Sequence, residues 1–102
     1  LDAVFAASDS MALGAMQELR REGKNVPNDV AIIGFDDIDL ATSAVPPLTT
    51  LRQDPILQGR MMVRLLMQLL GRTNDLSKAS RAALTGETEV VLPVQLMRRE
   101  SA

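Results

Sequence analysis

The stretch that decides the fold is AVFAASDSMALGAMQELRREGKNVPNDVAIIGF, from Ala3 to Phe35. It opens with the apolar run Ala3–Ala7 and closes with Val30–Phe35, which is rich in β-branched residues and too short for a helix. Between these runs, apolar residues recur at helical spacing: Met11, Ala12, Ala15, Met16 and Leu19. Gly23 follows as a helix-ending residue. Strand, helix and strand make a βαβ unit, which predicts parallel strands and a right-handed crossover.

A second pair of elements is expected further along the chain. Leu48–Arg52 has the composition of a third short strand. Asp54 followed by Pro55 is typical of a helix start, with Asp as the cap and Pro in the first helical position. Apolar residues at helical spacing continue to about Leu70. We therefore predict a helix that starts at Pro55.

The remaining segments carry weaker signals. The stretch Ala41–Pro47 is loop-like, and Arg72–Glu87 is polar and weakly patterned, which indicates a loop. Val90–Met97 is strand-like but contains Pro93, which predicts an edge, a bulge or a bend.

The composition excludes several kinds of function. The chain has 102 residues, a net charge of −2, no Cys and no His, and its only aromatic residues are two Phe. This piece lacks the basic surface that grips nucleic acid and the aromatic side chains on which bases stack. Without His and Cys, a zinc site would have to be made of carboxylates alone, which is unusual. The commonest general base and glycine-rich phosphate loops are absent. We therefore expect no metal site, no cofactor and no catalytic residues. No apolar run approaches the ~20 residues of a membrane span.

Polar residues follow the first two predicted strands. In parallel sheets, ligands bind at the carboxyl ends of the strands, where Ser8 and Asp36 would lie on one rim. Asp36 directly follows a strand that is expected to be buried, where an unused acid would be costly. Its carboxylate could accept hydrogen bonds from two neighbouring hydroxyls of a sugar. We expect Asp9 to cap the helix, Ser8 to act either as a cap or as a ligand contact, and Asp37 and Asp39 to be solvated.

Four motifs in order, ASDSMALGAM, VPNDVAIIGFDD, PPLTTLRQ and LPVQLMRRES, make the chain similar to the C-terminal part of the effector-binding domain of LacI/GalR-type bacterial transcription regulators. The resemblance covers nearly the whole chain except roughly residues 72–89. It implies an α/β fold of the periplasmic-binding-protein-like type I. The parts would be a parallel-sheet βαβ unit, a hinge crossing strand, a helix and a return strand. Residues 1–51 would belong to the C-terminal subdomain, 52–89 to the hinge crossing and the N-terminal subdomain's helix, and 90–102 to the strand that returns.

The same resemblance assigns roles to residues. It implies that Ser8, Asp36 and Gln53 contact the effector. Some relatives carry an aromatic residue that stacks on the ligand at the position of Pro55, and proline cannot do this. The first helix has apolar residues on two sides, and the resemblance places one side in a dimer interface made by Leu13, Met16, Ala44, Val45 and Pro46.

The implied function is binding of a small effector, a sugar or sugar derivative, by an allosteric homodimer or larger oligomer. Operator DNA would be bound by an N-terminal domain that is not in this chain. The regulator would be a repressor, and it would be cytoplasmic. The opening LDAVFAAS enters a strand at once, so we expect the chain to be part of a longer protein. A sugar-binding protein of a transport system, with the same fold, is the alternative. An enzyme is the third possibility and the least supported by the residues.

Overall fold

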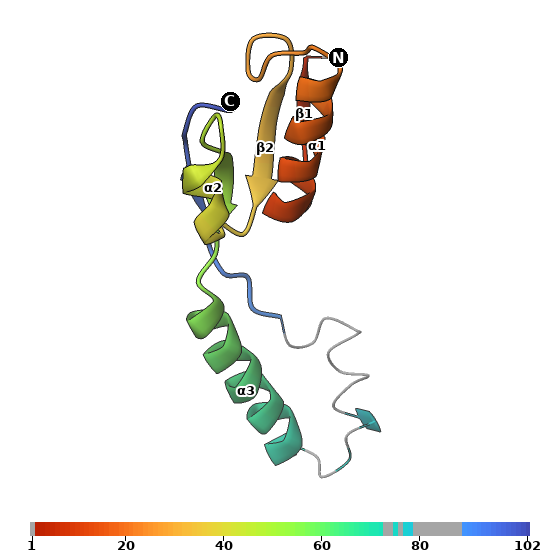
Figure 1. Ribbon diagram of the computed structural model, residues 1–102. Coiled ribbons are helices and arrows are strands. Elements are labelled where there is room, and N and C mark those ends of the chain that lie inside the picture. Colours follow the sequence, from red (N-terminus) through yellow and green to blue (C-terminus); the bar gives the residue numbers. More distant parts are fainter. Residues whose placement is uncertain (1, 73–74, 76, 79–88) are drawn as a thin grey trace. The chain divides into compact units, whose positions relative to one another are not determined.

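The computed structural model describes residues 2–72, 75, 77–78 and 89–102. The elements follow in the order β1 (Ala3–Phe5), α1 (Asp9–Arg21), β2 (Ala31–Phe35), α2 (Asp39–Ser43), β3 (Thr49–Arg52), α3 (Pro55–Arg72) and β4 (Gln95–Met97) (Figure 1). They form two compact units. One contains residues 1–53 and 94–102, and the other contains residues 54–93.

The first unit is built on a four-stranded sheet of order β1-β2-β3-β4. β1 and β2 pair in parallel with Ala3 opposite Ala31, and β2 and β3 pair in parallel with Phe35 opposite Leu51. β4 joins the edge of β3 in the antiparallel direction. The predicted α/β fold, with its parallel βαβ unit and third strand, is confirmed.

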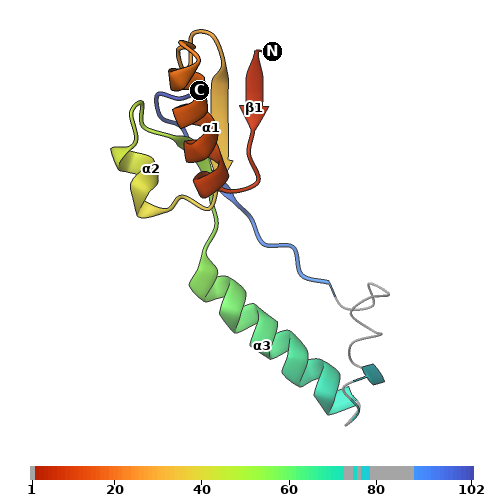
Figure 2. The ribbon, with the colours of Figure 1, turned by 45° about the vertical axis from the view of Figure 1, so that its right-hand side comes forward.

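Helix α1 begins and ends with ordinary capping interactions. The hydroxyl of Ser8 accepts a hydrogen bond from the amide of Met11 (3.2 Å), so Ser8 is the N-cap. Gly23 has a φ of 73°, and the amide of Lys24 donates to the carbonyl of Leu19, which is a glycine-based helix end. One face of α1 packs on β2, as Figure 2 shows. The core of the unit is formed by Ala6, Ala12, Met16, Val30, Ile32, Ala41 and Leu48.

The opposite face of the sheet is apolar but largely uncovered. Register partners in a sheet share a face, so Phe35, Leu51 and Leu96 lie side by side across β2, β3 and β4. Phe5 pairs with Ile33 on the same face. Phe5 is 62% exposed and Leu96 is 56% exposed. Sheets with parallel strands are normally covered on both faces, so this face lacks its second layer within the described part of the chain.

Two predicted segments differ from the structure. The loop expected at Ala41–Pro47 is replaced up to Ser43 by α2, where Ala41 is fully buried against the core. The strand expected from Val90 begins only at Gln95. Pro93 has no amide hydrogen for a ladder, so pairing with β3 starts after it. Most of the loop expected at residues 72–87 lies outside the described residues.

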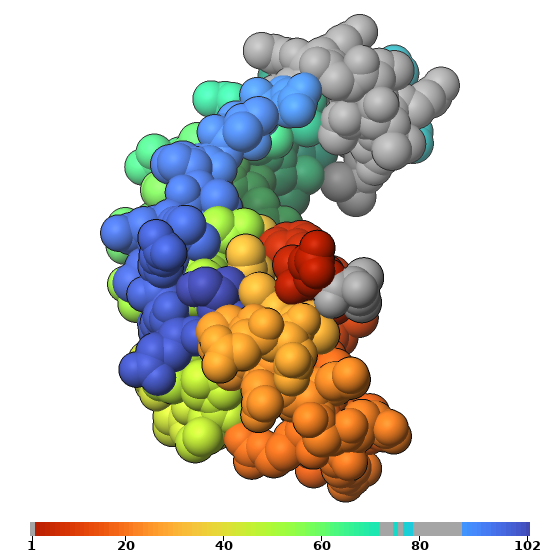
Figure 3. Space-filling model, turned by 90° about the horizontal axis from the view of Figure 1, so that it is seen from above, coloured from red at the N-terminus to blue at the C-terminus, as the bar shows by residue number. Residues whose placement is uncertain are grey.

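The last residues of the chain join two strands of the sheet. Ser101 is fully buried, and its hydroxyl donates to the carbonyl of Ile32 (2.7 Å) and accepts from the amide of Thr49 (2.8 Å). Its carbonyl also accepts a hydrogen bond from the amide of Ile32. In Figure 3 these blue residues lie against the orange segment that contains β2. Losing the hydroxyl would leave two buried backbone groups without these partners, at a cost of about 1–3 kcal/mol each.

The described part of the second unit is mainly α3. As predicted, Asp54 caps it, since its carboxylate accepts from the amide of Leu57 (2.9 Å). Leu69 is buried, whereas Ile56, Val63 and Met67 are each at least 60% exposed. No helix in the described part of the chain combines the length and the apolar character needed to cross a bilayer.

Candidate functional site

Three of the polar residues singled out from the sequence lie at one edge of the sheet. Ser8 follows β1, Asp36 follows β2 and Gln53 follows β3. These three strands are parallel neighbours, so their carboxyl ends meet at the same edge. That edge is where ligands bind in parallel α/β sheets.

Asp36 and Gln53 are in direct contact. The side-chain amide of Gln53 donates a hydrogen bond to Oδ1 of Asp36 (2.6 Å). The Asp36 side chain is exposed. Ser8 lies at the same edge but bonds to Met11 as a helix cap, which uses only an acceptor position of its hydroxyl. The hydroxyl proton of Ser8 can therefore still be donated to a ligand.

The backbone after β2 has an unusual conformation. Asp36 has a φ of 114° and Asp37 has a φ of 56°, values that side-chain-bearing residues adopt at a cost of about 1–3 kcal/mol each. The amide of Asp36 donates to the carbonyl of Leu51, and the amide of Asp37 lies 3.4 Å from the hydroxyl of Thr50. The amide of Ile38 donates to Asp9 (2.8 Å). Three successive amides are therefore held by neighbouring elements.

The side chain of Asp9 holds the loop that follows β2. Its side chain is fully buried, Oδ2 accepts from the amide of Ile38, and Oδ1 accepts from the hydroxyl of Thr50 (2.6 Å). The expectation that Asp9 caps α1 was wrong, because Ser8 takes that position and Asp9 is the first residue of the helix. A buried carboxylate is tolerated when such hydrogen bonds replace its water.

Gly34 makes room for the Asp9 carboxylate. A Cβ atom added to Gly34 would lie 2.2 Å from Oδ1 of Asp9 and 3.1 Å from the side chain of Leu48. Both neighbours are fully buried and cannot swing away. The absence of a side chain at position 34 is therefore a packing requirement.

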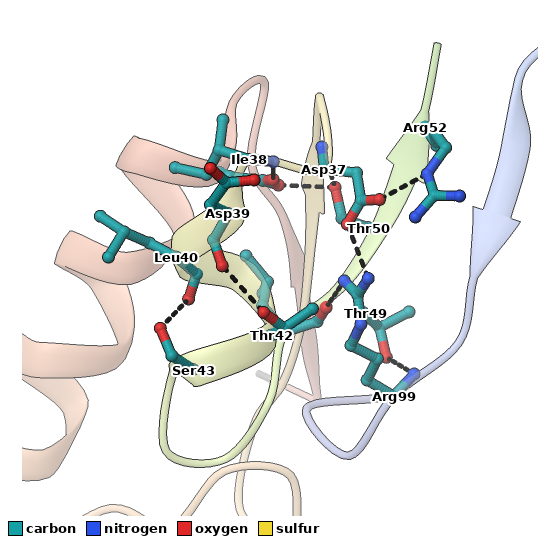
Figure 4. Close-up of polar contacts among 12 residues, drawn as sticks. Asp37, Ile38, Asp39, Leu40, Thr42, Ser43, Thr49, Thr50, Arg52 and Arg99 are labelled. Carbon is teal, nitrogen blue, oxygen red and sulfur yellow. Dashed lines mark hydrogen bonds and ion pairs between the residues drawn. The ribbon is translucent and has the colours of Figure 1, made fainter. Parts of the chain in front are cut away.

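Asp37 is held between two arginines, as Figure 4 shows. Its Oδ1 lies 2.7 Å from Nη2 of Arg99, and its Oδ2 accepts from Nε of Arg52 (2.6 Å). Burial raises the pKa of Asp37, but hydrogen bonds and positive charge from Arg99 and Arg52 outweigh it, so the pKa lies below its ordinary value of 3.8. The prediction of a solvated Asp37 was wrong, since its side chain is only 5% exposed. Asp39, expected to be solvated, is exposed.

Arg99 ties the C-terminal segment to this loop, a contact that sequence analysis missed. Its Nη1 donates to the carbonyl of Leu48 (2.8 Å), and its amide donates to the hydroxyl of Thr49 (2.8 Å) (Figure 4). The adjacent acids Asp36 and Asp37 were the available signal, because successive side chains of an extended chain point to opposite sides. This alternation indicates that one of the two faces the protein, but it does not indicate which one.

The arrangement is suited to binding polar groups. An exposed carboxylate bonded to an amide, with a hydroxyl at the same sheet edge, offers acceptors and donors to a ligand with several hydroxyls. In the part of the chain that the structure describes, no group of three or more acidic side chains is placed to hold a metal ion.

The residues predicted to form a dimer interface surround a shallow groove on the first unit. A depression of about 250 Å³ is lined by Leu13, Met16, Gln17, Arg20, Ala44 and Val45. An adjoining depression of about 150 Å³ also includes Pro46. Val45 is 70% exposed, whereas Met16 is 6% exposed and belongs to the core.

The chain matches the model of the periplasmic binding protein-like domain over residues 2–102. The chain belongs to the periplasmic binding protein-like domain family. The regulator CelR of Thermobifida fusca is 44% identical over 105 residues, covering 99% of this chain and 27% of CelR. The repressor CytR of Escherichia coli K12 is 51% identical over 71 residues, covering 69% of this chain and 21% of CytR. The chain thus spans about a quarter of the length of these relatives.

Two solved structures of transcription regulators also match the chain. A CelR–cellobiose complex matches with a TM-score of 0.74 and 43% identity, over 100% of this chain and 28% of that one. The Lac repressor bound to ONPG matches with a TM-score of 0.74 and 33% identity, over 99% of this chain and 27% of that one. The resemblance to LacI-type regulators is confirmed. The relatives named here are transcription regulators rather than enzymes or transport proteins, as the sequence led us to expect.

We predict that Gly34→Ala strongly destabilises this periplasmic binding protein-like domain, because the new methyl group would collide with Asp9. Overpacking of this kind costs about 1–3 kcal/mol or more. Chemical denaturation would measure the free energy of unfolding. Gly14→Ala in α1 is the matched control, since a Cβ there meets nothing within 4 Å. It should stabilise the chain by about 0.5–1 kcal/mol. Equal effects of the two substitutions would contradict the packing role of Gly34.

We also predict that the contribution of Asp37 to stability disappears in acid. Because its folded-state pKa is lowered, the carboxylate stabilises the fold above the ordinary value of 3.8, and this is lost as the pH falls through the folded-state pKa. Asp37→Asn should cost about 1–3 kcal/mol at neutral pH. The difference from wild type should shrink below about pH 4. Urea unfolding at several pH values would measure it, and a difference that stays constant in acid would contradict the ion pairs.

Proposed function

We propose that this chain is the effector-binding and dimerisation portion of a LacI-type transcription regulator, and that its effector is a sugar or sugar derivative. The observation that carries the proposal is the exposed Asp36 carboxylate bonded to Gln53 at the carboxyl edge of the sheet. It is supported by the match to the CelR–cellobiose complex over the whole chain. The regulator relatives favour this function over a sugar-transport protein.

The chemistry of the site suits a sugar. A carboxylate with two oxygens accepts hydrogen bonds from neighbouring hydroxyls, and such charge-assisted bonds are stronger than neutral ones. A sugar hydroxyl at Asp36 would replace or share the bond that Gln53 now makes. Ser8 would then donate its hydroxyl proton to the same ligand, and the side-chain amide of Gln53 offers both a donor and an acceptor.

The two units correspond in this proposal to parts of two subdomains. Residues 1–53 and 94–102 would be part of the C-terminal subdomain, and residues 54–93 would include a helix of the N-terminal one. The uncovered sheet face with Phe5 and Leu96, and the exposed apolar side of α3, would be covered by the rest of a longer regulator. That regulator would bind operator DNA through a separate N-terminal domain in the cytoplasm. Effector binding would favour one of two dimer arrangements, so the sugar would control DNA binding allosterically.

Asp36→Asn tests the effector site in the full-length protein that carries this chain. Asn tolerates positive φ about as well as Asp, so the loop should persist while the charge is lost. Affinity should fall by about tenfold to hundredfold, the equivalent of a hydrogen bond to a charged group. Isothermal titration with cellobiose, glucose and ribose would identify a binding sugar and then compare the variants.

Asp39→Asn is the matched control, because Asp39 is an exposed acid close by in α2. It should bind the same sugar with the affinity of the wild type. Unchanged affinity in Asp36→Asn would remove Asp36 from the effector site. A wild-type protein that binds none of the three sugars, but binds another class of metabolite, would correct the effector class.

Val45→Glu tests the proposed dimer. Val45 lies at the groove formed by Leu13, Met16 and Ala44, and its exposure means that a charge there should not unfold the subunit. A charge placed in an apolar interface should weaken dimerisation by at least about tenfold. Analytical ultracentrifugation would measure the dissociation constant. Met11→Glu, at an exposed position of α1 outside the groove, should dimerise normally. Equal dimerisation of all three proteins would exclude this interface.

A further inference from the structure

We propose that Asp37, clamped by Arg99 and Arg52, is a positioning residue that fixes the Asp36 carboxylate for effector binding. The proposal rests on the proposed function of Asp36. The proposal extends that function, because the C-terminal segment that carries Arg99 would then help to hold the effector site in place. Asp37 itself would not touch the effector.

The conformation of the loop supplies the first reason. Asp36 and Asp37 both have positive φ values, and such backbone persists only when its surroundings hold it. The carboxylate of Asp37 is turned inward and 5% exposed, while the Asp36 side chain is exposed. Turning Asp37 away from the solvent fixes the direction in which its neighbour points. The two side chains are therefore set by one backbone conformation.

The second reason is the pair of arginines that bind Asp37. The two differ in how firmly they are held. Arg99 is 15% exposed, and it bridges Asp37 and the carbonyl of Leu48 through its two terminal nitrogens. Arg52 is 51% exposed and lies directly before Gln53 in the chain. The rigid pair is thus Asp37–Arg99, whereas Arg52 joins the same carboxylate to the strand end that carries Gln53. Both partners of the Asp36–Gln53 hydrogen bond are consequently anchored through Asp37.

The backbone contacts of the loop supply the third reason. Amides of Asp36 and Ile38 are held by Leu51 and by the buried Asp9, so both sides of Asp37 are fixed. The amide of Asp37 itself has only a long contact of 3.4 Å with the hydroxyl of Thr50. The strongest bonds made by Asp37 are those of its side chain, at 2.6 and 2.7 Å. Removing the charge of Asp37 therefore frees the part of the loop next to the effector carboxylate.

The test uses the full-length protein that carries this chain, with the variants Asp37→Asn, Arg99→Gln, Arg52→Gln and Ser101→Ala. The first readout, amide hydrogen exchange, needs no effector. Asp37→Asn and Arg99→Gln should speed exchange of the Asp36 and Ile38 amides at least about tenfold. Arg52→Gln, which removes the more exposed partner, should have a smaller effect. Ser101→Ala, the structural control, should speed exchange at Thr49 and leave the loop unchanged.

The second readout is the affinity for the sugar that titration with cellobiose, glucose and ribose identifies. Asp37→Asn and Arg99→Gln should each weaken binding at least about tenfold, and the double variant should lose little more, because both act through one pair. Ser101→Ala should bind as the wild type does, although it also disturbs the sheet. That contrast separates positioning of Asp36 from a general loss of stability.

Two results would overturn the proposal. Loop exchange that is unchanged in Asp37→Asn would show that Asp37 does not hold the loop, whether or not a sugar binds. Faster loop exchange with unchanged sugar affinity would show that the held conformation does not matter for binding. A wild-type protein that binds none of the sugars would contradict the proposed effector class, and the exchange measurement alone would then decide whether Asp37 positions the loop.

Discussion

The carboxylate of Asp9 is fully buried, and it accepts hydrogen bonds from the amide of Ile38 and the hydroxyl of Thr50. These two bonds connect the start of α1 with β3 and with the loop that follows β2. They are possible only because Gly34 has no side chain. The edge of the sheet that carries Asp36 and Gln53 thus depends on a fully buried acid. The hydrogen bonds of Asp9 to Ile38 and Thr50 fix the position of the loop, independently of the residues that face the solvent.

The adjacent acids Asp36 and Asp37 illustrate how a site and its support can be built from the same residue type. Asp36 faces the solvent and bonds to Gln53, whereas Asp37 faces inward and bonds to two arginines. The two residues have the same side chain and differ in exposure and ion pairing. The backbone with positive φ at these two residues is thus held by buried contacts, while the Asp36 carboxylate stays exposed to solvent.

Features set by local interactions were predictable from the sequence, and features set by distant partners were not. The βαβ unit, β3 and the start of α3 at Pro55 follow from periodicity and from capping residues that lie next to each other in the chain. The division of roles between Ser8 and Asp9 was missed, because adjacent cap-forming residues give the same local signal. The burial of Asp37 was missed because Arg99 lies near the far end of the chain. The start of β4 at Gln95 depends on pairing with β3, which local composition does not reveal.

The bonds of Ser101 have a consequence for the order in which the first unit folds. During synthesis, β1, α1 and β2 emerge together and can form their local contacts early. The hydrogen bonds of Ser101 to Ile32 and Thr49 form later, because all of residues 54–93 emerge before Ser101. Closing such a long loop is entropically costly and slow compared with local pairing. The strands β1, β2 and β3 can therefore pair first, and we expect the Ser101 bridge and β4 to complete the sheet only after the second unit has emerged.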